Sequence, residues 1–140
     1  MRRGQVLEEA RRWIGTPYRH QGSRLGVGCD CLGLLRGIWR SLYGCEPEAV
    51  PAYSRDWAEA RMDEPLLEAA RRHMTEVPVQ AAMPGDVLAF RWRRQLPAKH
   101  LAILADGETI IHAYEGHAVA VSPLVPAWQS RIAAAFQFPA

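Results

Sequence analysis

The stretch Gly28-Cys29-Asp30-Cys31-Leu32-Gly33-Leu34-Leu35 decides how this chain is organised. It opens an apolar run at helical spacing that continues to Leu42. Asp30 stands where a helix N-cap is expected, so Cys31 falls in the first helical turn. The free N–H groups and the positive dipole end at that turn favour a thiolate over a thiol. Cys31 is therefore a candidate nucleophile if a histidine reaches it; a small buried cysteine at the start of a core helix is the alternative.

Length and composition limit the kinds of protein this chain can be. Its 140 residues are enough for one domain with a proper core, and we expect a single domain over residues 1–140. The formal net charge of +2 is too small to indicate a nucleic-acid partner. No run of about twenty apolar residues is present, so we expect no membrane span.

The N-terminus and the cysteines indicate where the chain is made. Met1-Arg2-Arg3-Gly4-Gln5-Val6 has no long apolar region behind its basic residues, so we predict no secretory signal peptide. The three cysteines, Cys29, Cys31 and Cys45, are an odd number, and the first two are poorly spaced for a structural disulfide. We therefore expect synthesis in the reducing cytoplasm, and any work outside it would need a route other than Sec export.

The order of the predicted elements indicates the fold class. Apolar periodicity predicts a helix over residues 5–14 and another from Cys31 to about Tyr43, with Gly44 as its C′ residue. One or two further helices, broken near Pro65, should end by His73. After residue 86 the apolar period changes from 3.6 to 2, which predicts four or five strands near residues 87–90, 101–104, 109–112, 118–121 and 132–138. The sequence thus predicts an α+β fold, with the Cys31 helix packed on an antiparallel sheet.

Two of the five histidines, His100 and His112, bracket a predicted hairpin at Asp106-Gly107. If Gly107 adopts the left-handed conformation of a G1 bulge, His100 lies directly opposite His112. Directly opposed residues share one face, with Cβ atoms about 5 Å apart. One hairpin could then supply a base and the group that orients it, and we expect both rings on one face, turned toward Cys31.

Five short motifs follow one another in an informative order. They are Gly15-Thr16-Pro17-Tyr18, Asp30-Cys31-Leu32-Gly33-Leu34, Pro84-Gly85-Asp86-Val87-Leu88, His100-Leu101-Ala102-Ile103-Leu104 and Ile110-Ile111-His112-Ala113. Each is weak alone, but five in order are specific. Over most of its length the sequence resembles the NlpC-type cell-wall cysteine peptidases, the papain-like hydrolases of bacterial peptidoglycan. The resemblance implies a papain-like fold.

The resemblance also implies a role for individual residues. Cys31 would be the nucleophile, His100 the general base and His112 the third residue, which orients the base. The backbone N–H of Cys31 is the natural donor to an oxyanion. No metal or cofactor is expected. The candidate oxyanion or substrate-binding residues are Tyr18, Asp30 and Leu32.

The substrate implied by the resemblance is the peptide stem of peptidoglycan. A Cys-His-His triad would cleave a stem amide, with γ-D-glutamyl–diaminopimelate as the expected bond, through a thioester intermediate. The segment Tyr53-Ser54-Arg55-Asp56-Trp57 is similar, more narrowly, to members encoded with the tail genes of phages and gene transfer agents. This implies phage-like tail proteins as partners, with a phage-like particle delivering the enzyme to the cell wall.

The chain departs from the family pattern in three places. Leu32 stands where a small hydroxyl residue is usual, and His20-Gln21-Gly22 where an aromatic-Gly-Gly run is usual. Both positions line the expected substrate groove, so they bear on peptide specificity more than on the type of reaction. The segment from about 45 to 80 is long for a minimal member, and its role stays open.

Two other interpretations of the site stay open at this stage. The first is a catalytically inactive tail or wall-binding module that keeps the fold, although all three catalytic positions are filled. The second is a zinc site built from Cys29, Cys31 and Cys45 with two histidines. A Cys-x-Cys pair without a second close pair is not a recognised zinc spacing. Wall binding without cleavage would favour the first interpretation, and stoichiometric zinc the second.

Overall fold

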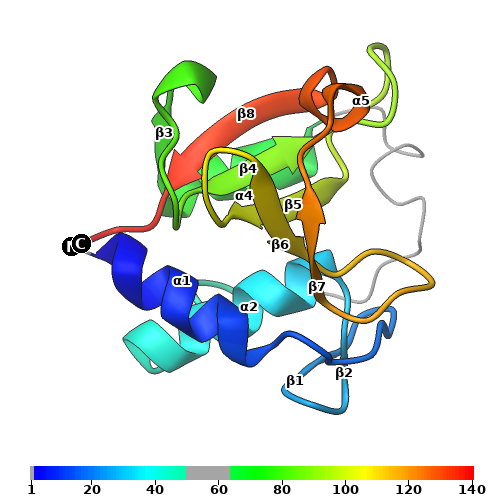
Figure 1. The fold of residues 1–140 in the computed structure, drawn as a ribbon. Helices are drawn as coiled ribbons and strands as arrows, with labels where there is room; N and C mark the ends of the chain where they lie inside the picture. Colours follow the sequence, from blue (N-terminus) through cyan, green and yellow to red (C-terminus); the bar gives the residue numbers. More distant parts are fainter. Residues whose placement is uncertain (1, 50–63) are drawn as a thin grey trace.

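An antiparallel sheet with helices on its faces dominates the computed structural model, which describes residues 2–49 and 64–140 (Figure 1). In these residues the helices are α1 (Arg2–Arg12), α2 (Cys31–Tyr43), α4 (Pro65–His73) and α5 (Pro126–Gln129), with a short 3-10 helix η1 (Val79–Ala81). Six described strands lie in the spatial order β3 (Thr75–Val77), β8 (Ile132–Gln137), β4 (Val87–Phe90), β5 (His100–Leu104), β6 (Thr109–His112) and β7 (Ala120–Pro123). A small separate pair, β1 (Ser23–Arg24) and β2 (Gly28–Cys29), precedes α2.

The predicted α+β class is confirmed, and so is the helix that begins at Cys31. Gly44 ends α2 in the left-handed conformation (φ 88°), and its N–H donates to the Arg40 carbonyl. Pro65 begins α4 at its first turn, where a missing N–H costs nothing. Of the one or two helices predicted to be broken near Pro65 and to end by His73, any part before residue 64 lies outside the described residues. Within the described ranges, none of the helices has the length and apolar character needed to cross a membrane.

Both faces of the sheet are apolar because both are covered. On one face, α1 and α2 pack against Val87, Leu101 and Ile103 (Figure 1). The alternating residues of the same strands form a second cluster on the other face, with Trp128 of α5 packed against it. This explains why these strands are nearly continuous apolar runs. Leu34 of α2 is fully buried, which is worth about 1.5–3 kcal/mol for a side chain of this size.

The Pro84-Gly85-Asp86 motif fastens α1 to the beginning of β4. The Asp86 carboxylate is fully buried and accepts two bonds from the Arg3 guanidinium, at 2.9 and 3.2 Å. It also accepts the Met83 N–H at 2.9 Å. Gly85 has φ 96°, and a Cβ there would lie 2.4 Å from the Arg3 carbonyl oxygen. This motif is therefore explained by the packing of α1 on the sheet.

Tyr43, the last residue of α2, contacts both ends of the chain. Its hydroxyl donates to the Pro139 carbonyl, and the Arg2 guanidinium lies over its ring at 5.0 Å from the centroid. The first helix and the last residues of the chain therefore meet at the C-terminal end of α2 (Figure 1).

The turn between β5 and β6 differs from the predicted one. The Ala105 N–H donates to the Thr109 carbonyl, which closes a three-residue loop, and Gly107 is not left-handed. Instead, the Asp106 carboxylate accepts the N–H groups of Glu108 and Thr109, at 2.7 and 2.8 Å. This side-chain cap removes the need for a bulge, so the predicted register is wrong by two residues.

In the observed register Ile103 pairs with Ile111 and Leu104 with Ile110. Continued toward the strand ends, it places Ala102 rather than His100 opposite His112. A shift of two residues preserves the face on which each side chain lies. The prediction that His100 and His112 share one face is therefore confirmed, whereas direct opposition is wrong.

Candidate active site

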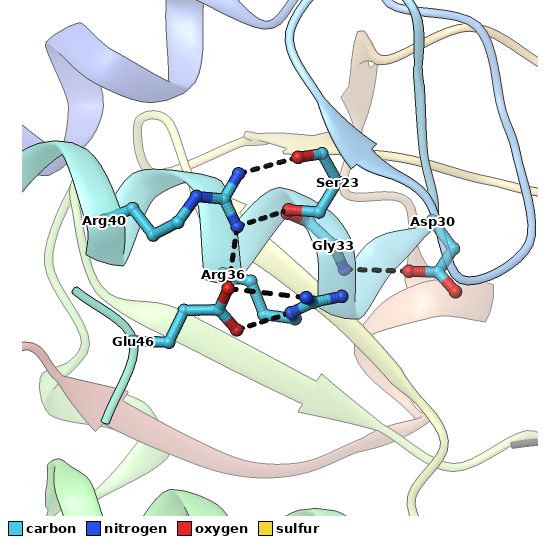
Figure 2. Close-up of polar contacts among 6 residues, drawn as sticks. All are labelled: Ser23, Asp30, Gly33, Arg36, Arg40 and Glu46. Atoms are coloured by element: carbon cyan, nitrogen blue, oxygen red, sulfur yellow. Dashed lines mark hydrogen bonds and ion pairs between the residues drawn. The ribbon is translucent and has the colours of Figure 1, made fainter. Parts of the chain in front are cut away.

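Asp30 holds the loop before α2 against the first turn of the helix. It is buried, and its Oδ1 accepts the Gly33 N–H at 2.7 Å, as the N-cap prediction requires (Figure 2). Its Oδ2 accepts the Gln21 N–H at 2.8 Å. A Cβ on Gly33 would lie 1.7 Å from the Gly22 carbonyl oxygen, so loop and helix approach closely only because Gly33 has no side chain. Asp30 thereby fixes Cys31 as the first residue of α2.

A second set of bonds fastens the same loop further along α2 (Figure 2). The Ser23 hydroxyl donates to the Gly33 carbonyl at 2.6 Å, and Arg40 donates to the Ser23 carbonyl and hydroxyl at 2.6 and 3.0 Å. Arg40 and Arg36 also bind the Glu46 carboxylate, at 3.0 and 2.7 Å. Hydrogen bonds from Arg36 and then Arg40 hold the pKa of Glu46 below its usual range, although burial opposes them. Ser23, which precedes α2 in the chain, and Glu46, which follows it, are thus both bonded to residues of the helix.

Leu32 follows Cys31 directly in the chain, and Tyr18 pairs through its backbone with Cys29, two residues before Cys31. Tyr18 forms an isolated β-bridge with Cys29, since the Cys29 N–H donates to Pro17 and the Arg19 N–H donates to Cys29, each at 3.0 Å. Both Tyr18 and Leu32 are half-buried and pack against the main core. Their predicted contact with substrate stays a prediction, as does that of Asp30, whose two oxygens bind backbone groups.

The two histidines are in direct contact. Nε2 of His100 lies 2.8 Å from Nδ1 of His112, and each residue is only 4% exposed. Nε2 of His112 lies 3.0 Å from the hydroxyl of Ser122 on β7. The structure therefore contains a continuous hydrogen-bonded chain across strands β5, β6 and β7.

Aromatic rings surround the hydrogen-bonded series His100–His112–Ser122. Trp92 stacks on His100 with ring centroids 5.3 Å apart, and Tyr114 stacks on His112 at 5.8 Å. Trp128 lies 5.6 Å from His100 and 5.4 Å from His112. These aromatics and Ser122 belong to none of the five sequence motifs. The one local signal is that Tyr114 follows His112 by two residues, which in extended chain places both side chains on one side.

Cys31 meets the sheet at the start of β5. Its thiol donates to the Lys99 carbonyl, with sulfur and oxygen 3.8 Å apart. Cys31 packs against the cluster on the α2 side of the sheet, whereas Phe90, the partner of His100 in the ladder, belongs to the cluster on the other side. The thiol therefore reaches β5 from the α2 side and contacts the backbone of the residue before His100, whose ladder partner Phe90 lies on the other side. The expected turn of both histidine rings toward Cys31 stays a prediction.

The protonation state of Cys31 differs from the expectation drawn from its helix position. Burial, and after it the negative charge of Asp30, raise the pKa of the Cys31 thiol to about 12. The N–H groups of Leu101 and Leu32 oppose this rise but do not overcome it. Burial also raises the pKa of Cys29 to about 12, so acidity does not distinguish the two thiols. Desolvation outweighs the helix terminus here, and the resting thiol is protonated.

The histidines are also neutral at rest. Burial, and to a smaller extent the charge of His112, lower the pKa of His100 to about 3. Burial and then His117 lower the pKa of His112 to about 4. A neutral imidazole at His100 is the form that can accept a proton. In the described residues, no group of three or more His, Cys, Asp or Glu side chains is arranged to hold a metal ion.

A candidate nucleophile at a helix N-terminus, packed on an antiparallel sheet that carries two histidines, defines a papain-like domain. The chain belongs to the NlpC/P60 family, whose model matches residues 15–137. Among individual proteins, gamma-DL-glutamyl hydrolase of Bacillus subtilis (strain 168) is 27% identical over 129 residues. These residues are 91% of this chain but 27% of that protein, so this chain spans a minor part of its relative's length.

Solved structures agree on the fold. The NlpC/p60 domain of the peptidoglycan hydrolase SagA matches with a TM-score of 0.68 and 23% identity, over 99% of this chain and all of that one. RipD of Mycobacterium tuberculosis, described as a non-catalytic NlpC/p60 domain protein adapted to peptidoglycan binding, matches with a TM-score of 0.59 and 15% identity. That match covers 98% of this chain and 96% of RipD. These likenesses confirm the papain-like α+β architecture.

Proposed function

We propose that this chain is a cysteine peptidase that hydrolyses an amide bond in the peptide stem of peptidoglycan. The observation that carries the proposal is the buried contact between His100 on β5 and His112 on β6, 2.8 Å apart, beside Lys99, whose carbonyl contacts the Cys31 thiol. Membership of the NlpC/P60 family supports it. The similarity to gamma-DL-glutamyl hydrolase supports a γ-glutamyl amide as the kind of bond cleaved. We propose γ-D-glutamyl–diaminopimelate, the bond that the sequence resemblance implies.

In the proposed reaction Cys31 is the nucleophile and His100 the general base. His100 uses Nε2 toward His112, so Nδ1 is the ring nitrogen that accepts the thiol proton. The sulfur attacks the amide carbonyl, and the negative charge that develops on its oxygen is stabilised by the Cys31 backbone N–H, with the Tyr18 hydroxyl as a second donor. His100 then protonates the leaving amine. Water then attacks the thioester carbonyl while His100 takes a proton from it. The C–S bond breaks and that proton returns to the Cys31 sulfur, which restores the thiol and the neutral His100.

The resting protonation states determine when the proton moves. With a thiol pKa of about 12 and a His100 pKa of about 3, a preformed ion pair is strongly unfavourable. Proton transfer must therefore accompany attack on the carbonyl, so that the thiolate is consumed as it forms. In this mechanism His100 acts as a general base during the attack.

Substrate contacts are proposed for the residues around the nucleophile. Tyr18 and Leu32 are half-buried, and each adjoins the Cys29–Cys31 segment. Leu32 offers only apolar surface where the family usually has a hydroxyl group, so we expect an apolar contact with the stem peptide at this point. Asp30 contributes by holding the first turn of α2 in place.

The route to the cell wall is proposed from the sequence resemblance. The segment Tyr53–Trp57 lies outside the described residues, and its similarity to members encoded with tail genes supports delivery by a phage-like particle. We propose that the chain is made in the cytoplasm and carried to the wall by tail proteins. Immunodetection of the chain in purified particles would support this route, whereas a Sec-processed N-terminus would contradict it.

A wall-binding module without catalysis is the second candidate, and one observation favours it. A half-buried thiol with a pKa near 12 is poorly suited to act as a nucleophile in the free protein. RipD combines the same fold with a description as non-catalytic. Under this alternative, the chain would bind peptidoglycan and leave its amide bonds intact.

Digestion of purified peptidoglycan, followed by mass spectrometry of the released muropeptides, separates these candidates. Wild-type protein should release stem fragments cut at a peptide amide, and Cys31→Ala should release none. Cys45→Ser, which changes an exposed cysteine, is the matched control and should behave as wild type. Binding without cleavage by the wild type would support the wall-binding candidate. Cleaved glycan strands with intact stems would contradict both.

A further inference from the structure

We propose that Ser122 is a positioning residue. It determines which ring nitrogen of His100 and of His112 carries the proton, an arrangement called here the proton order of the pair. The inference rests on the proposed function, because it concerns how His100 is kept ready to accept the Cys31 proton. Three contacts carry it: the 2.8 Å contact between the rings, the 3.0 Å contact between His112 and Ser122, and the burial of both histidines.

The position of Ser122 in the sheet explains why it reaches His112. Ser122 pairs with Ile110 in the β6–β7 ladder, while Ala120 pairs with His112. Residues two apart along a strand share a face, so Ser122 lies diagonally beside His112 on the side that carries both rings. Trp128, 5.4 Å from His112, closes the same space with an aromatic ring. The serine hydroxyl is thus a built-in partner for a ring nitrogen that is largely withdrawn from water.

Two proton orders can satisfy the contact between the histidines. In the first, His100 carries its proton on Nε2 and donates to Nδ1 of His112, whose own proton on Nε2 is donated to the Ser122 oxygen. In the second, the serine donates to Nε2 of His112, which donates from Nδ1 to Nε2 of His100. The proton of His100 is then on Nδ1, the nitrogen that has to accept the thiol proton in the proposed reaction. Only the first order leaves a lone pair on Nδ1 to accept the thiol proton.

The first order also suits the charged state that follows. When the Cys31 S–H bond breaks, its proton forms a new bond to Nδ1 of His100, and the electron pair of the broken bond stays on sulfur. The His100 imidazolium keeps its Nε2 proton and donates it to His112, and His112 keeps donating to Ser122. No other proton moves. Ser122 therefore acts as an acceptor before and after the transfer, and the relay needs no rearrangement.

The test compares Ser122→Ala with Ser122→Thr, which restores the hydroxyl on a residue that suits a strand. Ser122→Ala should lower kcat for a soluble stem-peptide substrate about tenfold, the effect of one lost hydrogen bond between neutral groups, with KM little changed. Ser122→Thr should recover most of that loss. Val121→Ala, on the same strand with its side chain exposed, is the matched control and should keep wild-type kcat.

A spectroscopic measurement tests the inference without turnover. The ring-nitrogen shifts of ¹⁵N-labelled histidine should show the wild-type His112 protonated on Nε2, and Ser122→Ala should shift His112 toward a mixture of tautomers. If wild-type His112 is instead protonated on Nδ1, or if Ser122→Ala keeps both kcat and the wild-type tautomer, the inference is wrong. A wild type that cleaves no better than Cys31→Ala would contradict the proposed function, and the tautomer of His112 would still decide the role of Ser122.

Discussion

Trp92 stacks on the imidazole of His100, with ring centroids 5.3 Å apart and ring planes 26° from parallel. The indole is one of the aromatic rings that pack on His100, which is only 4% exposed. Since burial is the main reason that the pKa of His100 is low, the stack contributes to keeping this histidine neutral.

Trp92→Ala should therefore raise the pKa of His100 from about 3 toward its ordinary value near 6.5. Water admitted by the truncation stabilises the imidazolium. Titration of the histidine ring protons by NMR measures the change directly. Trp92→Phe, which keeps an aromatic cover, should show a smaller rise. Trp39→Ala removes an indole that packs on Tyr43 and Phe138 instead and should leave His100 unchanged.

The two buried histidines should make the fold sensitive to acid. In the unfolded chain they bind protons near pH 6.5, whereas in the folded protein they do so near pH 3 and 4. Between these values the unfolded state holds more protons, so the free energy of unfolding should fall as the pH drops from about 6.5 toward 4. The slope should approach ~1.4 kcal/mol per pH unit for each histidine.

Urea denaturation at several pH values between 7.5 and 4.5 measures this slope. A double variant, His100→Gln with His112→Gln, should lose much of the dependence in this range. An identical slope in the double variant would show that other groups cause the acid sensitivity.

The three cysteines should differ in reactivity according to exposure. Cys45 is exposed, Cys31 half-buried and Cys29 fully buried. Iodoacetamide at neutral pH should modify Cys45 first and Cys31 slowly, because the raised pKa keeps the Cys31 thiol protonated. The rate at Cys31 should increase as the pH rises above 9. Peptide mapping after timed quenching gives the three rates, and fast labelling of Cys31 below pH 7 would show a thiolate that this structure does not predict.

Gly33→Ala tests the close approach between α2 and the preceding loop. The new methyl group would collide with the Gly22 carbonyl, so the variant should lose about 1–3 kcal/mol or more of stability. Gly4→Ala is the matched control, since Gly4 lies within α1 with open space around its Cα, and it should gain about 0.5–1 kcal/mol. Thermal unfolding of both variants beside the wild type measures the difference. Equal stability of Gly33→Ala and the wild type would show that the loop can move away.

The parts of this structure that could be predicted from the sequence are those determined by contacts between residues close together in the chain. Asp30 and Gly44 bound α2 through contacts within a few residues, so the helix could be placed accurately. The β5–β6 register was less predictable, because two local solutions compete at Asp106-Gly107. The Asp106 carboxylate caps two N–H groups, and this interaction replaces a left-handed Gly107. No periodic pattern distinguishes these two turns.

The surroundings of the histidine pair could not be predicted from the sequence. Trp92 and Trp128 come together across the sheet from segments 36 positions apart, and neither belongs to a motif. Ser122 lies in β7, which runs two residues further along the chain than the predicted strand. The acidity of Cys31 depends on how much water its neighbours exclude. The extent of this desolvation depends on the packed structure and cannot be derived from the position of Cys31 at a helix terminus.

The contacts of Tyr43 show that the first helix and the last residues of the chain lie close together in space. One side chain touches Arg2 and Pro139, so a short linker could join the first helix to the last residues with a small loss of chain entropy. The order in which the elements follow one another is then largely separable from their arrangement in space. A rearranged chain that starts in the exposed loop at Arg93 and Arg94 should rebuild the same helix-and-sheet packing around Cys31, His100 and His112.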